Sequence, residues 1–169
     1  MKQRRRSTAG QSVVEFALIL PILLVLFFGI IDFGMLLSKQ HVINQMAKEL
    51  TREASVGAEE SVLLARGERF AKFVIPISGK TVSHESGATI FTYSTSEGES
   101  VNPDTSVYVT ITPSLNGRDR GEIIEVAVTH NYVPLTPILD FVVYWFGREA
   151  DDSILLNSTY STMVEQDAN

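Results

Sequence analysis

The chain has 169 residues, of which 44% are hydrophobic and 20% are charged, and it contains no cysteine. A chain of this length supports one small domain beside a membrane segment, and that domain must be held by its core and not by disulfides. The formal net charge of −6 argues against binding to nucleic acid or to an anionic lipid surface.

Residues 16–37 form a long apolar segment near the N-terminus. From Phe16 to Leu37 the only formal charge is Asp32. At about 1.5 Å per residue, a helix over this segment spans the roughly 30 Å hydrocarbon core of a bilayer. The ten residues before Gln11 hold four basic residues and no acid. The positive-inside rule therefore predicts a cytoplasmic N-terminus and places everything after Leu37 outside the cytoplasm.

Two residues inside this segment depart from a uniform membrane helix. Pro21 has no amide to donate to the carbonyl of Ala17, so we expect a kink or a locally opened turn there. The kink would ease extraction or packing into an assembly, although membrane helices also tolerate prolines without such a role. Asp32 lies five residues before Leu37, about 8 Å at helical rise, so its side chain could reach the interface. We favour this position over the alternative, in which Asp32 is buried against a partner.

Glu15 stands at the start of the apolar segment, where a carboxylate is costly unless it is neutralised. A cut between Gly10 and Gln11 would supply a partner, because it creates an α-amine on the residue that lies four positions before Glu15. Residues four apart share one face of a helix. The amine could pair with Glu15 of its own chain or of a neighbour. In the alternative interpretation the chain is a plain signal anchor whose Glu15 reaches the headgroups.

The residues around this bond resemble the processing site of prepilin-like proteins, which a membrane aspartic peptidase cuts after the glycine. Gly10, Gln11, Glu15 and Phe16 carry the resemblance. The longer run, from Gly10 through Pro21 to Asp32 and the glycine at 34, is similar to the TadE-like pseudopilins of the tight-adherence (Flp pilus) secretion system. The resemblance is specific over about thirty residues.

The resemblance implies a minor pseudopilin that is processed and takes part in the assembly or initiation of a Flp type IV pilus, for adhesion, biofilm formation or secretion. It implies a single-pass protein of the bacterial inner membrane with a periplasmic C-terminal domain. The implied partners are the prepilin peptidase, other pilin-like subunits (the major pilin and a second minor pseudopilin), the inner-membrane assembly platform and the bilayer, and not nucleic acid. Glu15 and Phe16 would serve subunit assembly. The alternative is an uncleaved, membrane-anchored extracytoplasmic binding module or adhesin.

Helical periodicity continues beyond the membrane segment. Ile43, Met46 and Leu50 recur at spacings of three and four residues, and Gly57 is a plausible stop. A single spine helix over residues 11–56 is therefore expected. A second helix is predicted from Glu59 to about Val74, before a proline, and one of its faces is suited to lie against the spine. That face consists of Leu63, Gly67, Phe70 and Val74.

After residue 79 the period of the pattern changes to two. It predicts β segments over residues 81–84, 88–95, 106–112, 122–133 and 154–163. The turn residues between 114 and 121 predict that the segment after them pairs antiparallel with the segment before them. Val126 and its alternate neighbours should point into the core, and His130 and Tyr132 continue that side.

These elements predict an α+β fold of pilin-like design, with a long transmembrane spine helix, a second helix and a small antiparallel β-sheet. The predicted parts are a leader over residues 1–10 that is removed, a spine over 11–57, an outer domain over 58–164 and a tail over 165–169. An apolar patch over 138–147 is too short to span a membrane. It could complete the core, lie on the membrane surface, or present aromatic side chains to a partner, namely Phe141, Tyr144, Trp145 and Phe146.

The sequence offers no recognisable catalytic chemistry. It has no cysteine, three scattered histidines, and none of the G-x-S-x-G, H-E-x-x-H or glycine-rich phosphate-loop motifs. The acid pairs Asp151–Asp152 and Glu97/Glu99 fall in predicted loops, where solvated acids are common. We therefore expect a protein that is not an enzyme and binds neither a metal nor a cofactor.

Overall fold

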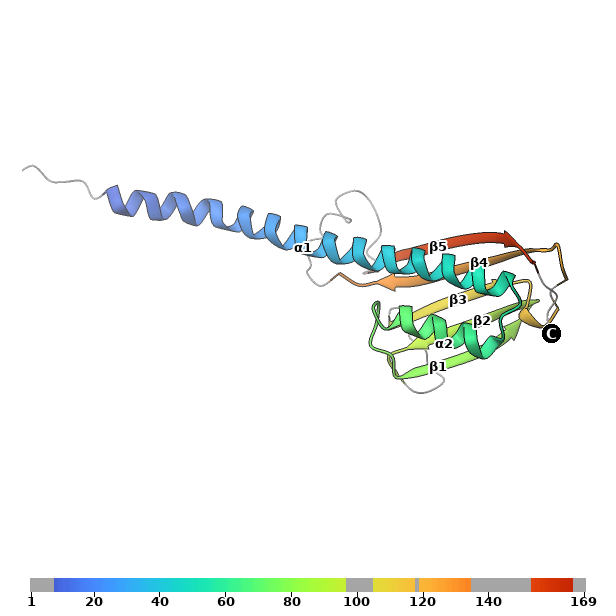
Figure 1. Cartoon of the computed structure of the whole chain (residues 1–169). Coiled ribbons are helices and arrows are strands. Elements are labelled where there is room, and N and C mark those ends of the chain that lie inside the picture. The colour runs from blue at the N-terminus through green and yellow to red at the C-terminus, as the bar shows by residue number, and fades with distance from the viewer. Residues whose placement is uncertain (1–7, 97–104, 118, 135–152, 166–169) are drawn as a thin grey trace, which may run out of the picture. The chain divides into compact units, whose positions relative to one another are not determined.

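The structure is a computed structural model that describes residues 8–96, 105–117, 119–134 and 153–165 (Figure 1). The chain is α+β with a pilin-like layout: a long apolar N-terminal helix, a second helix and a five-stranded antiparallel sheet. It divides into two compact units. Of the described elements, one unit holds α1 up to Met35, and the other holds α1 from Leu36, α2 and the sheet.

Helix α1 (Thr8–Ser55) is continuous over 48 residues and runs through Pro21. At 1.5 Å per residue its length is about 72 Å. It begins three residues earlier than predicted and ends where Gly57 adopts a positive φ of 80°. The Gly57 amide donates to the Ala54 carbonyl at 3.3 Å, and the Ala58 amide donates to the Glu53 carbonyl at 3.2 Å. These bonds form a Schellman motif, which confirms the predicted stop.

The outer part of α1 packs on the sheet through one apolar stripe. The buried residues recur at the predicted spacing, and they are Ile43, Met46, Ala47, Leu50 and Ala54. Two α1 side chains donate to main-chain carbonyls of β5 (Ile154–Met163): Gln40 Nε2 to Asn157 at 2.9 Å, and Thr51 Oγ1 to Tyr160 at 3.5 Å. The spine is therefore also hydrogen-bonded to β5, the last strand of the sheet.

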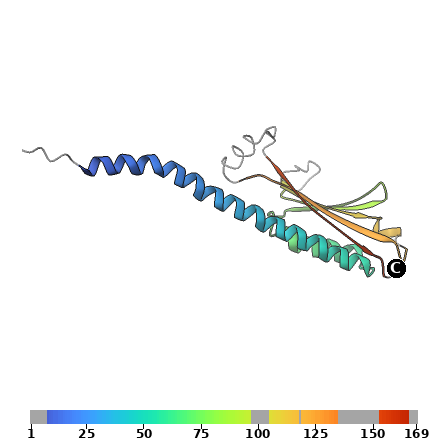
Figure 2. The same ribbon diagram turned by 90° about the horizontal axis from the view of Figure 1, so that it is seen from above.

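Helix α2 (Glu60–Ala71) is shorter than predicted, because the chain leaves the helix after Ala71. The amides of Val74 and Ile75 both donate to the Ala71 carbonyl at 2.9 Å, which closes tight turns before the proline. Of the predicted face, Leu63, Gly67 and Val74 are buried and Phe70 is half-buried, whereas the predicted helix end is wrong. Figure 2 shows α2 and the outer part of α1 on the same face of the sheet.

Five strands form the sheet in the order β1-β2-β3-β4-β5, and every neighbouring pair is antiparallel. The first four are β1 (Gly79–Glu85), β2 (Ala88–Ser94), β3 (Ser106–Thr112) and β4 (Ile123–Tyr132). All five predicted β segments are confirmed, with bounds that agree within two residues. The short turn η2 (Leu115–Gly117) lies between β3 and β4.

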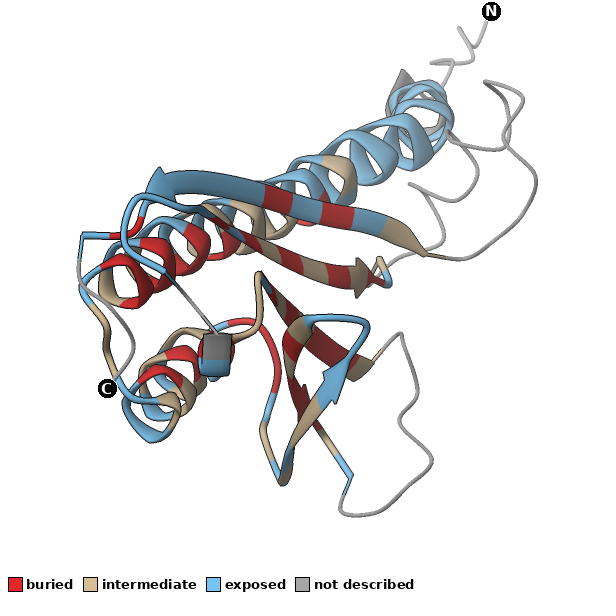
Figure 3. Cartoon of the chain, turned by 90° about the vertical axis from the view of Figure 1, so that its right-hand side faces the viewer, coloured by how far each residue is buried: buried red, intermediate tan, exposed pale blue. Residues whose placement is uncertain are grey.

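The inner face of the sheet forms the core with the two helices. Along β4, Ile124, Val126 and Val128 are buried, while Glu125 is exposed, so the predicted faces are correct (Figure 3). His130 and Tyr132 continue the buried side as predicted. The buried His130 Nδ1–H donates to the Ser106 carbonyl at 2.8 Å.

At Gly67 the backbone of α2 lies directly against the side chain of Tyr93 on β2. A Cβ atom at this position would lie 2.9 Å from Tyr93 Cζ and 3.2 Å from Met46 Cε. The Tyr93 hydroxyl donates to the Leu64 carbonyl at 2.9 Å, and burial raises the pKa of Tyr93, so it stays a donor. The absence of a side chain at Gly67 therefore sets the distance between helix and sheet.

We predict that Gly67→Ala destabilises the outer domain by roughly 1–3 kcal/mol, because overpacking outweighs the roughly 1 kcal/mol gain in helix propensity. Urea unfolding of the full-length protein in detergent measures this loss. Combining the change with Tyr93→Phe, which removes the hydroxyl nearest the new methyl group, should recover part of it. A Gly67→Ala variant as stable as the native protein would contradict this view of the helix–sheet contact.

Candidate assembly site

The inner half of α1 presents an apolar surface that the described residues do not cover. A window of 18 residues in this helix has a mean hydropathy of 2.8, and none of the window is buried. A helix of this length and composition is able to cross a bilayer. It indicates a single-pass membrane anchor at the N-terminus.

The residues of the predicted processing site lie at the start of α1. The Gly10–Gln11 bond belongs to the first helical turn. Gln11 Nε2 donates to Glu15 Oε1 at 3.1 Å, so these two residues share one face of the helix, as their spacing predicts. Phe16 is exposed beside them. A terminal amine on residue 11 would therefore lie on the helix face that carries the carboxylate.

Asp32 does not lie where the sequence predicted. Its side chain is fully buried, with an exposed fraction of 0%, whereas its neighbours Ile31 and Phe33 are 38% and 55% exposed. Gly29, Met35 and Leu36, which share its helix face at spacings of three and four, are half-buried. The burial of this side chain favours the second of the two expectations, a buried Asp32, over extension to the membrane interface.

Two further predictions are not decided by the described residues. The helix passes through Pro21 without interruption, and the kink stays a prediction. The candidate contact patch, with Phe141, Tyr144, Trp145 and Phe146, lies outside the described residues.

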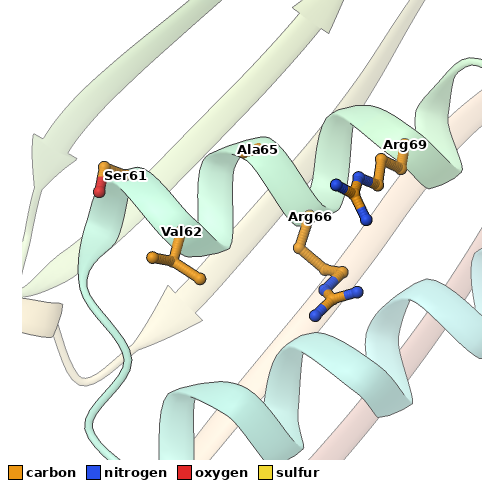
Figure 4. A pocket seen from close by; sticks show the side chains of 5 residues that line it. All are labelled: Ser61, Val62, Ala65, Arg66 and Arg69. Carbon is orange, nitrogen blue, oxygen red and sulfur yellow. The ribbon is translucent and has the colours of Figure 1, made fainter.

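The structure also shows a groove that sequence reasoning did not identify. It runs along α2 and has a volume of about 270 Å³, with a lining of Ser61, Val62, Ala65, Arg66 and Arg69. Figure 4 shows Val62, Arg66 and Arg69 pointing from α2 toward α1. Arg66 forms an ion pair with Glu53 of α1 at 2.6 Å, and that hydrogen bond and charge raise the pKa of Arg66. The sequence did contain one signal for this groove: Arg66 and Arg69 are three residues apart, so they lie on the same side of the helix.

A comparison with known families supports the assignment of the N-terminal helix. The sequence model of the family described as TadE-like protein matches residues 10–52. The matched range starts at Gly10, includes Glu15, Phe16, Pro21 and Asp32, and ends within α1. No curated protein and no solved structure matches the chain. The similarity to TadE-like proteins therefore covers residues 10–52, which make up most of the long N-terminal helix.

Proposed function

We propose that this chain is a minor pseudopilin, cut by a prepilin peptidase between Gly10 and Gln11, that takes part in assembling or initiating a Flp type IV pilus. The observation that carries the proposal is the TadE-like match, which begins at Gly10 and covers a helix whose inner half is apolar and exposed. The family implies involvement in the tight-adherence pilus system. The processing and the assembly role are inferred from the residues at the helix start.

Cleavage would place a cationic amine and a carboxylate at the same end of a membrane helix. In hydrocarbon an unpaired Glu15 is unfavourable, whereas the amine of an adjacent subunit would restore a charge pair. The attraction between two charges is large in a low dielectric and weakens as they separate, so the pair would favour one axial register between packed helices. The exposed Phe16 would add apolar contact beside it.

The proposal places α1 across the bacterial inner membrane, with its N-terminus in the cytoplasm and its sheet-bearing domain in the periplasm. The four basic residues of the leader support this orientation. Its partners would be the prepilin peptidase, the major pilin and a second minor pseudopilin, the assembly platform and the lipid bilayer. In this proposal the chain performs no catalysis of its own.

The orientation is tested by fusing alkaline phosphatase, which is active only outside the cytoplasm, after the last residue of the chain. We expect an active enzyme. The same fusion made after Arg6 of the leader should be inactive, because that position stays in the cytoplasm. Activity of the second fusion together with inactivity of the first would reverse the proposed topology.

One observation favours the alternative of an uncleaved anchor. In the intact chain the Gln11 side chain already donates to Glu15, so the carboxylate has a polar partner without a new terminus. That hydrogen bond joins a neutral amide to a carboxylate within one chain. It therefore gives no reason for a neighbouring subunit to adopt one axial register. The two functions therefore differ in what Glu15 does between chains.

Glu15→Gln separates these functions, because it keeps the shape and polarity of the side chain and removes its charge. We expect normal membrane insertion and folding, with co-purification with the major pilin and the number of surface fibres both reduced about tenfold or more, since each 1.4 kcal/mol lost is a factor of ten. The matched control is Glu49→Gln on the outer part of the same helix, where Glu49 pairs with Arg52 at 3.8 Å. Wild-type fibres in Glu15→Gln would favour the plain anchor.

A further inference from the structure

Helix α2 separates its charges between two sides. Its acids face β1, where Glu60 contacts His84 at 2.9 Å and Glu68 contacts Lys80 at 2.9 Å. Glu68 also pairs with Lys72 at 2.7 Å, and its hydrogen bonds to both lysines lower the pKa of Glu68 to about 2. The acids of α2 are thus engaged within the domain, and the groove lining on its other side contains no acid.

The two arginines of the groove differ in whether they form an ion pair. Arg66 is held by Glu53, whose side chain is only 12% exposed. Arg69 is exposed, and within the part of the chain that the structure describes its guanidinium makes no ion pair or hydrogen bond. Arg69 is therefore the cation of the groove that is available to another molecule.

Apolar surface lies on the same side of α2 as this cation. Val62, Ala65 and Arg69 are spaced three and four residues apart, so they lie along one face. Val62 is 47% exposed, and Phe73, just beyond the end of the helix, is 76% exposed. A row of aliphatic, small and cationic side chains along one helix offers the contacts that an amphipathic helix of a partner can use.

We propose that the groove beside α2, with Val62, Ala65 and Arg69 as its contacts, docks a helix of a neighbouring pilin-like subunit that carries aliphatic side chains and a carboxylate. The inference rests on the proposed function and adds a second contact, made by the outer domain. Charge complementarity selects the occupant. The aliphatic side chains would cover Val62, and the carboxylate would accept a bidentate pair from Arg69.

The overall charge of the chain makes this cation unusual. Removing the four basic residues of the leader from the 14 in the chain leaves 10 basic against 20 acidic residues, a net charge of −10. Acidic surfaces repel one another, so a site with a free arginine and no lining acid is where an acidic partner can approach most favourably. Two contacts would then fix the axial register between neighbouring subunits: Glu15 in the membrane and Arg69 outside it.

The absence of cysteine from the chain allows a clean cross-linking test. Ala65→Cys in the full-length protein is labelled with a cysteine-reactive photo-crosslinker in cells that assemble fibres, and the adduct is mapped by mass spectrometry. We expect an adduct on a helix of another pilin-like subunit with an acid within one turn of the linked residue. A control label at Thr81→Cys, exposed on β1, should give no such adduct.

Charge reversal then tests the role of Arg69. Adding Arg69→Glu should lower the yield of the adduct about tenfold or more, because like charges would meet, whereas Arg69→Lys should retain part of it. Arg120→Glu, which makes the same charge change before β4, should have no effect. An unchanged yield with Arg69→Glu, an adduct on a segment without acids, or an adduct on lipid alone would overturn the inference.

The same samples distinguish this failure from failure of the proposed function. The N-terminal residue of the labelled protein is read in each variant. One outcome would refute only the docking groove: the protein is cleaved, the fibres are normal, and the adduct yield does not change with Arg69→Glu. Protein that still begins at Met1 in the presence of active peptidase would refute the proposed pseudopilin itself.

Discussion

Val126→Asp should unfold the outer domain of the full-length protein. Val126 is fully buried on β4, between Ile111 of β3 and Tyr160 of β5 in the sheet register. A carboxylate placed there would have no cationic partner in this row of the sheet, and burying it would cost several kcal/mol. Small domains have only about 5–15 kcal/mol of stability, so this loss is sufficient to populate the unfolded state.

Far-ultraviolet circular dichroism during heating, together with limited proteolysis, measures this effect. The matched control is Thr159→Asp, which introduces the same charge on the exposed, outer face of β5 opposite Ala127. That control should unfold within a few degrees of the native protein, since exposed substitutions usually change stability by about 0.5 kcal/mol or less. Equal melting temperatures for native protein and Val126→Asp would show that the core does not lie on this face.

Gly10→Leu should abolish maturation and fibre formation while leaving the outer domain folded. The proposed cut follows Gly10, and a bulky side chain there would fill the space that the peptidase must leave beside the bond. Leucine also forms helix more readily than glycine, by roughly 0.8–1 kcal/mol, so it would hold the first turn of α1 closed around that bond. The protein should accumulate in the membrane with its leader attached.

Immunoblotting for the ten-residue difference in length and counting surface fibres measure this outcome. Gly29→Ala is the matched control, because a methyl group at this glycine of the same helix would meet nothing within 4 Å. It should be processed and assembled like the native protein. Normal maturation of Gly10→Leu would contradict the assigned cleavage position, and fibres from the uncleaved variant would contradict the need for a new amine.

The elements that sequence predicted well are those whose signal is local. Alternation predicted the bounds of β3, where Val107, Val109 and Ile111 are buried because one side of the strand covers the core. The stop of α1 at Gly57 was predictable because a positive φ favours glycine. In α2 the apolar spacing continued to Val74 after the helix had ended, because a turn can keep a residue buried without keeping the helix.

The features that sequence missed depend on contacts between distant residues. The position of Asp32 was inferred from its depth in the membrane alone, and depth does not state which face of α1 is covered. The state of the groove residues depends on such contacts, because Arg66 pairs with Glu53 on another helix. A contact between residues on two different helices leaves no periodic pattern in the sequence. That Arg66 is paired and Arg69 is not, among the residues described, could therefore be seen only in the structure.

The N-terminal residue of the protein purified from membranes tests the central claim most directly. Intact-mass spectrometry and N-terminal sequencing are applied to protein from cells with and without the prepilin peptidase. The account predicts Gln11 as the first residue when the peptidase is active, and Met1 when it is absent. A protein that keeps Met1 in cells with active peptidase would contradict the account, and the uncleaved anchor would then be the better description.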